Sequence, residues 1–367
     1  MYNALVSRIL WFNIGEMENM SEKKLVLVTG ASGRTGRAVI SALQKYDICI
    51  RAYIRRSEVA DDLKKLGVDE IILGDLFDFD VLGTAIGDCS EVLHICPPMN
   101  PREAELAKKI TDLCSKNGVR RLVLYSVLHP LLSEVRHHHL KLEAEEYLIN
   151  SNQNYTILQP GRYMQHHALI WEEILTTGKH RMPFSIDAKF NVVDVADLAE
   201  AAAIVLTGDG HDFATYQLAG PDSLSQLDMA KIISEVIGKP VSAEAKSKNE
   251  FIESAEKAGM TADRIEQLTV MNGHYDEHGL VGNSNVLEWI LGRPATNFSS
   301  YKNVVADVHS ELLLQVEKAI SAGVSSDQII IDPGIGFAKK TSHNLALLRN
   351  LDILVNSNYP VLVGPSR

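Results

Sequence analysis

Three glycines stand three residues apart, directly after an apolar run, in the segment KLVLVTGASGRTGRAV. Gly30, Gly33 and Gly36 predict a tight turn between a strand and a helix, and a turn without Cβ atoms lets a pyrophosphate approach the backbone closely. The helix that follows would offer free N–H donors and a partial positive charge to such a group. An ordinary glycine-rich turn is the alternative interpretation. The predicted dinucleotide-binding residues of this turn are Gly30, Ser32, Gly33, Arg34, Thr35 and Gly36.

A second apolar run, ICIRAYIRR (48–56), predicts the next strand, and it ends in two arginines. A site selective for NAD usually places an acid here to bind the ribose hydroxyls, whereas a guanidinium suits a 2′-phosphate. Arg55, together with Arg34 of the glycine turn, therefore favours NADP(H), and NAD(H) stays an open alternative. Two solvated arginines without a ligand would give the same pattern.

Short β-rich runs alternate with helical stretches through the first half of the chain. This alternation predicts right-handed crossovers and a parallel sheet covered on both faces, the α/β doubly wound Rossmann fold. We expect strands at 24–30, 48–56, 69–75, 91–98, 119–126 and 154–161, and helices at 34–46, 101–117 and 134–150. Later in the chain we expect a strand and a helix capped by Asp194 or Asp197 within 190–208, a strand and a helix within 215–241, and mostly helix over 246–293.

The pattern divides the chain into four predicted parts. These are an extension at 1–22, a Rossmann core at 23–165, a small and mostly helical substrate lobe at 166–300 that interleaves with the core, and a separate fragment at 301–367. Met20 is an alternative start, and a weak amphipathic anchor is the alternative role for the extension.

Composition restricts the classes of function. Hydrophobic residues make up 46% and charged residues 23%, which is typical of a globular protein, and no apolar run is long enough to span a membrane. The net charge of −11 argues against a nucleic-acid surface that depends on bulk charge. The four cysteines form no CxxC pair, so we expect reduced thiols and a cytoplasmic location. A small molecule is the expected partner, and a homodimer is an open alternative.

Several segments together carry a family resemblance: VLVTGASGRTGRAV, GDLFD (74–78), KLEAEEYL (141–148), YTILQPGRYMQ (155–165) and YQLAGPDSLSQ (216–226). Over about residues 24–300 the chain resembles the NmrA-like group of atypical short-chain dehydrogenases/reductases. The resemblance implies a Rossmann domain with a small C-terminal lobe. It also implies either an NAD(P)H-dependent reductase of a quinone or another small carbonyl compound, or a regulator that senses NAD(P) without turnover.

Typical short-chain dehydrogenases use a Tyr-x-x-x-Lys pair, and here Lys141 matches the lysine while His137 stands at the tyrosine position. The resemblance implies that Lys141 holds the nicotinamide ribose, with Glu145 orienting it, and that Ser126 faces the substrate. His137 is the candidate replacement acid because the reference pKa of histidine is about 6.5; a partly exposed helix histidine is the alternative. His137, His138 and His139 point in different directions on a helix, so we expect no metal site.

The resemblance also places further residues against the cofactor. Cys96 and Pro97 follow the fourth strand, and Pro160 and Tyr163 belong to the loop after the sixth strand. Asp75, in the GDLFD segment, is expected to contact the cofactor as well. His94 and Cys96 are interpreted as packing residues rather than catalysts.

The segment IIIDPGIGFAKKTSHNLALLRNL, followed by YPVLVGPSR, is similar to the C-terminal part of dihydropteroate synthase, a pterin-binding TIM-barrel enzyme of folate biosynthesis. The resemblance implies pterin contacts by Asp332, Lys339 and Arg367. The first strands of the barrel have no counterpart, so we expect a partial barrel fragment without transferase activity. Folate-pathway transfer is the third alternative for function.

Overall fold

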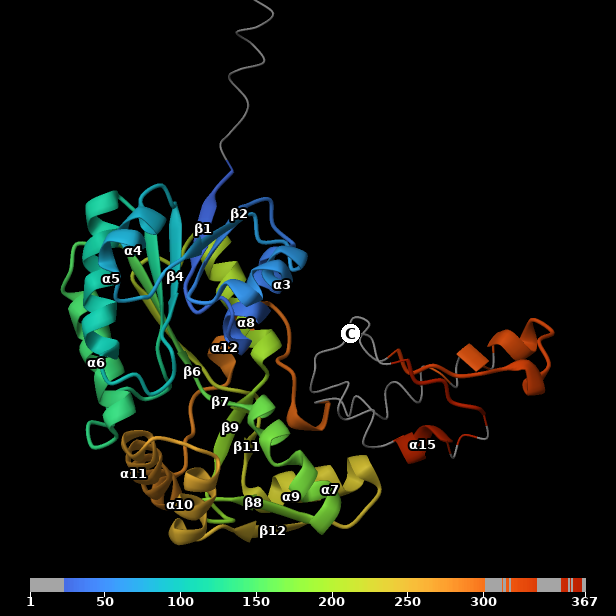
Figure 1. Ribbon diagram of the computed structural model, residues 1–367. Helices are drawn as coiled ribbons and strands as arrows, with labels where there is room; N and C mark the ends of the chain where they lie inside the picture. Colours follow the sequence, from blue (N-terminus) through green and yellow to red (C-terminus); the bar gives the residue numbers. More distant parts are fainter. Residues whose placement is uncertain are drawn as a thin grey trace, which may run out of the picture.

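The computed structural model describes residues 23–300, 312, 315–316, 318–334, 351–355, 357 and 359–364. Within this part of the chain, seven parallel strands form the main sheet in the order β10-β6-β5-β4-β1-β2-β3 (Figure 1). Its strands are β1 (Leu25–Val28), β2 (Cys49–Ile54), β3 (Glu70–Leu73), β4 (Glu91–Ile95), β5 (Arg121–Tyr125), β6 (Tyr155–Pro160) and β10 (Ala214–Leu218).

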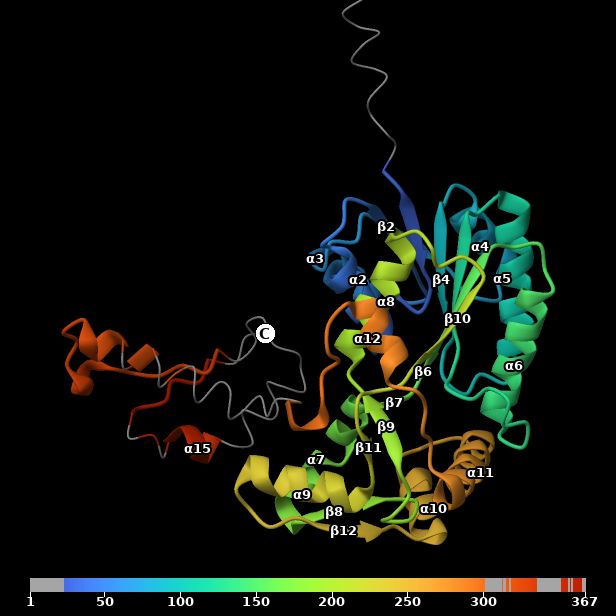
Figure 2. The ribbon, with the colours of Figure 1, turned by 180° about the vertical axis from the view of Figure 1, so that it is seen from behind.

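Helices cover both faces of this sheet, as the alternating pattern predicts. Buried side chains of α2, α8 and α12 form one apolar cluster with the sheet, and those of α4, α5 and α6 form another on the opposite face. Figure 2 shows the first group of helices from the reverse side. The helices of the first 300 residues are α2 (Arg34–Leu43), α3 (Ala60–Lys65), α4 (Phe79–Ile86), α5 (Glu103–Asn117), α6 (Arg136–Ile149), α7 (Trp171–Thr177), α8 (Val195–Thr207), α9 (Gln226–Ile237), α10 (Lys248–Lys257), α11 (Ala262–His278) and α12 (Asn285–Leu291).

The strand order reverses direction at β1. The chain moves outward from β1 to β2 and β3 on one side, and then returns to β4 and continues to β5 and β6 on the other side. In open parallel sheets, ligands bind outside the carboxyl ends of the strands at such a switch point. Since all seven strands are parallel, the residues that follow each of them meet at one border, which we call the carboxyl edge.

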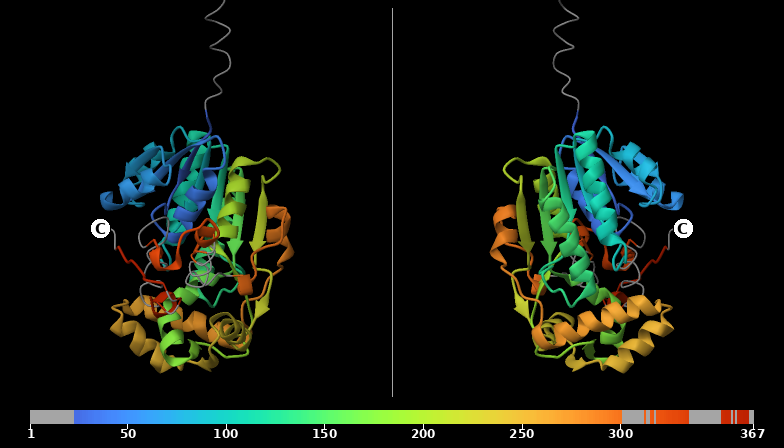
Figure 3. Two further views of the ribbon diagram at one scale, coloured as in Figure 1. Left: turned by 90° about the vertical axis from the view of Figure 1, so that its right-hand side faces the viewer. Right: turned by 90° about the vertical axis from the view of Figure 1, so that its left-hand side faces the viewer.

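The smaller lobe contains short strands besides the helices that the sequence pattern predicts. It contains a three-stranded sheet, β11-β9-β7, and a two-stranded sheet, β12-β8, which enclose an apolar cluster of their own with α7, α9 and α11. Figure 3 shows from two sides that this lobe lies beyond the carboxyl edge of the main sheet. Its strands are β7 (Arg162–Tyr163), β8 (Lys179–Met182), β9 (Phe190–Val193), β11 (Ser223–Leu224) and β12 (Ser242–Ala245).

Some elements within the sequence range of the lobe, residues 166–300, belong to the core. β10 pairs with β6 in the main sheet, and α8 and α12 pack on the core face that also holds α2. Asp194, rather than Asp197, caps α8, because its side chain accepts from the amide of Ala196.

The described tail residues do not form the predicted barrel fragment. In the described tail residues, an isolated parallel bridge joins Ile331 to Val361, and α15 (Leu351–Val355) precedes the second of these residues. Lys339 and Arg367 lie outside the described residues. Asp332 is exposed, and its carboxylate accepts a hydrogen bond of 2.8 Å from the amide of Gly334.

Candidate active site

The glycine turn after β1 has two kinds of glycine. Gly30 has a φ of 63°, and a Cβ there would lie 2.6 Å from the carbonyl oxygen of Ile95; a Cβ at Gly36 would overlap Gly30 and Ala31. These two glycines are required by the fold of the turn itself. A Cβ at Gly33 would meet only the carbonyl oxygen of Gly30, at 3.2 Å, which is a tight contact but much less crowded than at Gly30 or Gly36. The open side of Gly33 fits close approach of a pyrophosphate.

Helix α2 begins directly after Gly33 and leaves its first amides available. No side chain caps this end and no acidic residue stands in the first turn. The first N–H groups of a helix have no intrahelical acceptor, and together with the helix dipole they favour an anion. The turn and helix therefore fit the phosphates of a dinucleotide.

Two arginines border this anion site. Arg34 and Arg55 are both exposed, and within the described residues neither forms an ion pair. Their guanidinium groups are thus free of ion pairs in this part of the chain, and their binding of a 2′-phosphate stays a prediction. Asp75, after β3, is also exposed, and its carboxylate accepts from the amide of Phe77.

Tyr163 connects the loop after β6 to the glycine turn. Its hydroxyl lies 3.3 Å from that of Thr35 and donates over 3.0 Å to the hydroxyl of Tyr125. Burial raises the pKa of Tyr163, so the phenol stays protonated at neutral pH. Its ring stacks on that of His166, with centroids 5.2 Å apart.

The ammonium of Lys141, a residue of α6, reaches the end of β5, and the sequence pattern misses its acidic partner. Its ammonium donates over 2.5 Å to Glu103 of α5 and over 3.1 Å to the carbonyl oxygen of Tyr125. Burial alone would lower the pKa of Lys141, but the charge and hydrogen bond of Glu103 outweigh burial and raise the pKa. An ammonium has three N–H groups, so one remains for a ligand, which fits the expected ribose contact.

His137 lacks the acidity that its reference pKa suggests. Burial, followed by the positive charge of Lys141, lowers its pKa to about 3, and its Nδ1 lies 3.7 Å from Glu103 Oε2. The expectation of a pKa near neutrality is therefore wrong, and an acid role for His137 stays a prediction without that support. The adjacent histidines diverge, as expected: His138 contacts Tyr275, and His139 contacts Glu143.

Ser126 and Glu145 form a separate network beside Lys141. The hydroxyl of Ser126 donates to Glu145, and the amide of Gln159 donates to both oxygens of the same carboxylate. Burial raises the pKa of Glu145. Glu145 thus orients Ser126 and Gln159, whereas Glu103 orients Lys141; this corrects the expected role of Glu145.

The residues after β4 are mostly packing groups. Thr29 accepts from the amide of Ile95 and shares a hydrogen bond of 2.8 Å with Nδ1 of His94, whose pKa burial lowers to about 3. Burial also raises the pKa of the Cys96 thiol, which therefore stays protonated. Pro97 is exposed in the following turn, and Pro160 is buried at the end of β6. His94 and Cys96 match their interpretation as packing residues.

A comparison with known protein families matches residues 22–306 to the NmrA-like family. The chain belongs to this family. Residues 282–367 also match the family of pterin binding enzymes. Both resemblances seen in the sequence are thereby confirmed.

Known relatives agree with this division of the chain. An NAD(P)H azoreductase of Xenophilus azovorans is 25% identical over 278 residues, which cover 76% of this chain and 96% of the relative. The structure of an NADPH-dependent quinone oxidoreductase of Escherichia coli, complexed with NADPH, is 25% identical with a TM-score of 0.68 and covers 75% of this chain and 97% of that one. A dihydropteroate synthase of Mycobacterium leprae is 48% identical over 68 residues, which are 18% of this chain and 24% of the synthase.

No helix among the described residues is long and apolar enough to cross a membrane. No group of three or more histidine, cysteine or acidic side chains among them is placed to hold a metal ion.

Sequence reasoning missed two residues of this region. Glu103 stands 38 positions before Lys141, so no local spacing connects them. Arg162 lies inside the segment YTILQPGRYMQ, but nothing in the sequence shows that its guanidinium has no acidic partner.

Proposed function

We propose that this protein is an NAD(P)H-dependent reductase of quinones or related small electrophilic carbonyl compounds, with NADP(H) as the favoured cofactor. The main support is the convergence of groups at the carboxyl edge. The open glycine turn follows β1, Lys141 binds the last carbonyl group of β5, and Tyr163 reaches from the loop after β6 to Thr35 in α2. The named activities of the azoreductase and of the quinone oxidoreductase support the same class of reaction.

The residues fit the cofactor on their own geometry. Gly33 and the first amides of α2 would bind the pyrophosphate, the exposed Arg34 and Arg55 would bind a 2′-phosphate, and the remaining N–H of Lys141 would bind the ribose. Bound NADPH supplies a hydride, and the substrate takes up this hydride and one proton.

The acid–base properties of His94, His137 and Tyr163 favour quinones. Among the described residues here, His94 and His137 have pKa values lowered to about 3, and burial raises the pKa of Tyr163. None of these groups is poised to deliver a proton near pH 7. A reduced quinone is a phenolate-type anion with a pKa of about 10, as for tyrosine, whereas a reduced simple ketone is a far stronger base that needs an acid.

Steady-state assays test this proposal. NADPH oxidation is followed with a panel of benzoquinones and naphthoquinones, with simple ketones and aldehydes as controls, beside a fluorescence titration of NADPH binding. We expect turnover with quinones and little with simple ketones. Binding of NADPH without turnover of any compound would instead support the alternative of a cofactor-sensing regulator.

A further inference from the structure

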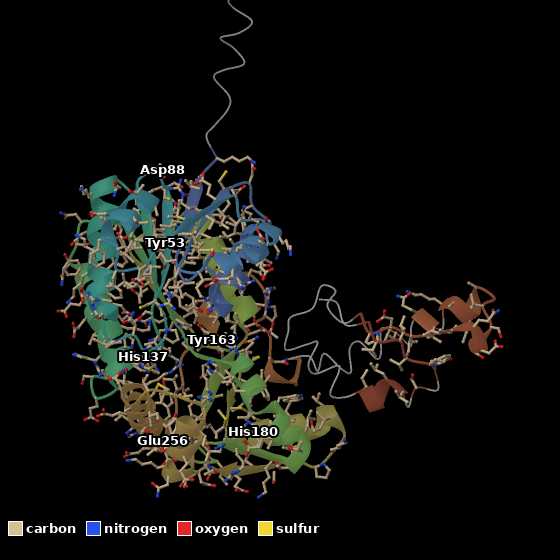
Figure 4. The ribbon with its side chains drawn as sticks, viewed as in Figure 1. Tyr53, Asp88, His137, Tyr163, His180 and Glu256 are labelled. Carbon is tan, nitrogen blue, oxygen red and sulfur yellow. The ribbon has the colours of Figure 1, made fainter. Side chains whose placement is uncertain are left out.

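Arg162 is an arginine of the carboxyl edge that the reductase chemistry above does not use. It is the first residue of β7, two residues after the end of β6 and next to Tyr163. Figure 4 shows Tyr163 where the main sheet meets the lobe. Neighbouring residues of a strand point to opposite sides, so Arg162 faces away from the contacts that Tyr163 makes with α2.

The side chain of Arg162 lies on aromatic rings of the lobe. Its guanidinium carbon is 5.0 Å from the ring centroid of Phe184 and 5.5 Å from that of Phe190. The two rings contact each other with centroids 4.5 Å apart, and both belong to the apolar cluster of the lobe. Stacking of this kind fixes the plane of a guanidinium but satisfies none of its N–H groups.

No acid neutralises this guanidinium. Within the described residues, Arg162 forms no ion pair and donates no hydrogen bond, and no carboxylate affects its pKa. Burial lowers the pKa of Arg162 to about 10, partly offset by Tyr275, so the group is still charged at neutral pH. Its nitrogens are not among the fully buried atoms without a partner, so the fork keeps contact with solvent.

The other titratable groups near Arg162 leave its charge uncompensated. His166, His167 and His180 all feel its positive charge, and burial followed by that charge lowers the pKa of His166 to about 3. The pKa of His180 is lowered to about 4, again mainly by burial. All three imidazoles are therefore neutral near pH 7, and Arg34 is a further cation close to His166.

We propose that Arg162 binds an acidic group of the substrate, a carboxylate or a sulfonate, so that the preferred substrates are anionic aromatic electrophiles. This proposal rests on the reductase function proposed above. The guanidinium of Arg162 is charged, stacks on two rings, is partly removed from water and has no acidic partner. A ligand anion that accepts two parallel hydrogen bonds would neutralise this charge and satisfy its N–H groups. The anion is assigned to the substrate and not to the cofactor, because Arg162 packs on the lobe cluster, whereas the phosphate-binding turn belongs to the core.

A matched pair of quinones tests this proposal by activity. The kcat/KM values for 1,4-naphthoquinone and 1,4-naphthoquinone-2-sulfonate are measured with saturating NADPH in the wild-type protein and in Arg162→Met. A charge-assisted contact predicts a loss of about 10- to 100-fold for the sulfonate and less than about threefold for the uncharged quinone. Arg264→Met changes an exposed arginine of α11 in the same lobe and should leave both values unchanged.

A binding experiment keeps the test independent of turnover. The affinities of naphthalene-2-sulfonate and of its uncharged sulfonamide are measured by calorimetry on the protein saturated with NADP⁺. Arg162→Met should weaken only the sulfonate, and Arg162→Lys, which keeps the charge but loses the fork, should give an intermediate loss. The lysine variant also serves if the methionine variant does not fold.

The possible results separate the two proposals. If the wild-type protein reduces neither quinone but binds the sulfonate through Arg162, the reductase function fails and the anion site stands. If Arg162→Met weakens NADPH instead of the sulfonate, its anion is a cofactor phosphate and the proposal is overturned. An equal loss for the charged and uncharged ligands would also overturn it, since Arg162 would then only shape the lobe.

Discussion

Lys141 of α6 and Glu103 of α5 form a buried ion pair at the carboxyl edge, with 2.5 Å between Nζ and Oε1. Both side chains are less than 10% exposed, and Oε2 of Glu103 accepts no hydrogen bond among the described residues. The pair joins two helices on one face of the sheet and holds the ammonium beside the last carbonyl group of β5. Removing the two charges from water costs free energy, and their mutual attraction offsets this cost.

Breaking this pair should cost more than removing it. Glu103→Gln leaves a buried ammonium without its counter-charge, so we expect the free energy of unfolding to fall by about 3–5 kcal/mol. The double variant Glu103→Gln/Lys141→Met removes the ammonium as well and should recover part of that loss. Urea unfolding measures all three proteins. A double variant less stable than Glu103→Gln would mean that Lys141 stabilises the fold without its partner.

Gly33 should be needed for binding but not for folding. Gly33→Asp places a carboxylate where the pyrophosphate would lie, and its charge repels the phosphates, so we expect NADPH binding to be lost. The melting temperature should fall less than in Gly36→Ala, because a Cβ at Gly33 meets only one backbone oxygen, at 3.2 Å. Gly36→Ala is the matched control: its Cβ overlaps Gly30 and Ala31, so it should lower the melting temperature. Equal NADPH affinity in Gly33→Asp and wild type would contradict the cofactor assignment.

The choice of cofactor should depend on Arg55. Arg55→Ala should weaken NADPH by about 10-fold or more and leave NADH nearly unchanged, since a charge-assisted phosphate contact contributes about 1.5–3 kcal/mol. Fluorescence titrations with both cofactors measure the ratio, and Arg56→Ala, the neighbouring exposed arginine, is the control. An equal loss of affinity for NADPH and NADH would show that Arg55 does not bind the 2′-phosphate.

The sequence predicts the core well because its signals are local. The strands and the glycine turn are marked by apolar runs that end in turn residues, and β1 to β6 each lie within the predicted ranges. The sequence also predicts β10 as a strand, but its pairing with β6 depends on a contact between residues about 58 positions apart, which no local pattern encodes.

The lobe and the charged partners were harder to predict. Strands β7 and β11 have two residues each, too short for an alternation of side chains, so the sequence pattern predicts a mostly helical lobe. The low pKa of His137 cannot be predicted from the sequence either. Burial and the charge of Lys141 set it, and burial depends on the packed fold.

Removing the tail should leave the cofactor site intact. The three apolar clusters of the described residues contain nothing beyond Phe298. We therefore expect a variant without residues 301–367 to bind NADPH within about twofold of the full chain, as measured by fluorescence titration. The melting temperature should fall by no more than a few degrees. A large loss of affinity would show that the tail supports the site.

Glu91 should make the stability of the fold depend on pH. It is fully buried at the start of β4, where burial raises its pKa to about 7 despite the attraction of Arg120 and Arg121. The folded protein then holds this proton more tightly than the unfolded chain, whose glutamate has a pKa near 4.5. The contribution of Glu91 to stability is therefore largest below about pH 4.5 and is lost as pH rises toward 7, by about 3 kcal/mol at most.

The glutamine variant isolates this effect from the other titrating groups. As pH rises from 5 to 8, the free energy of unfolding should fall more in wild type than in Glu91→Gln. Arg120 lies 2.6 Å from Glu91 and loses a charged partner in the variant. This loss changes the free energy of unfolding of the variant at high pH, but it does not change the sign of the pH dependence that Glu91 gives to wild type. Glu146→Gln, an exposed carboxylate of α6, should follow the wild-type curve. If Glu91→Gln and wild type change in parallel from pH 5 to pH 8, Glu91 is ionised throughout that range, and Arg120 outweighs the cost of burying its charge.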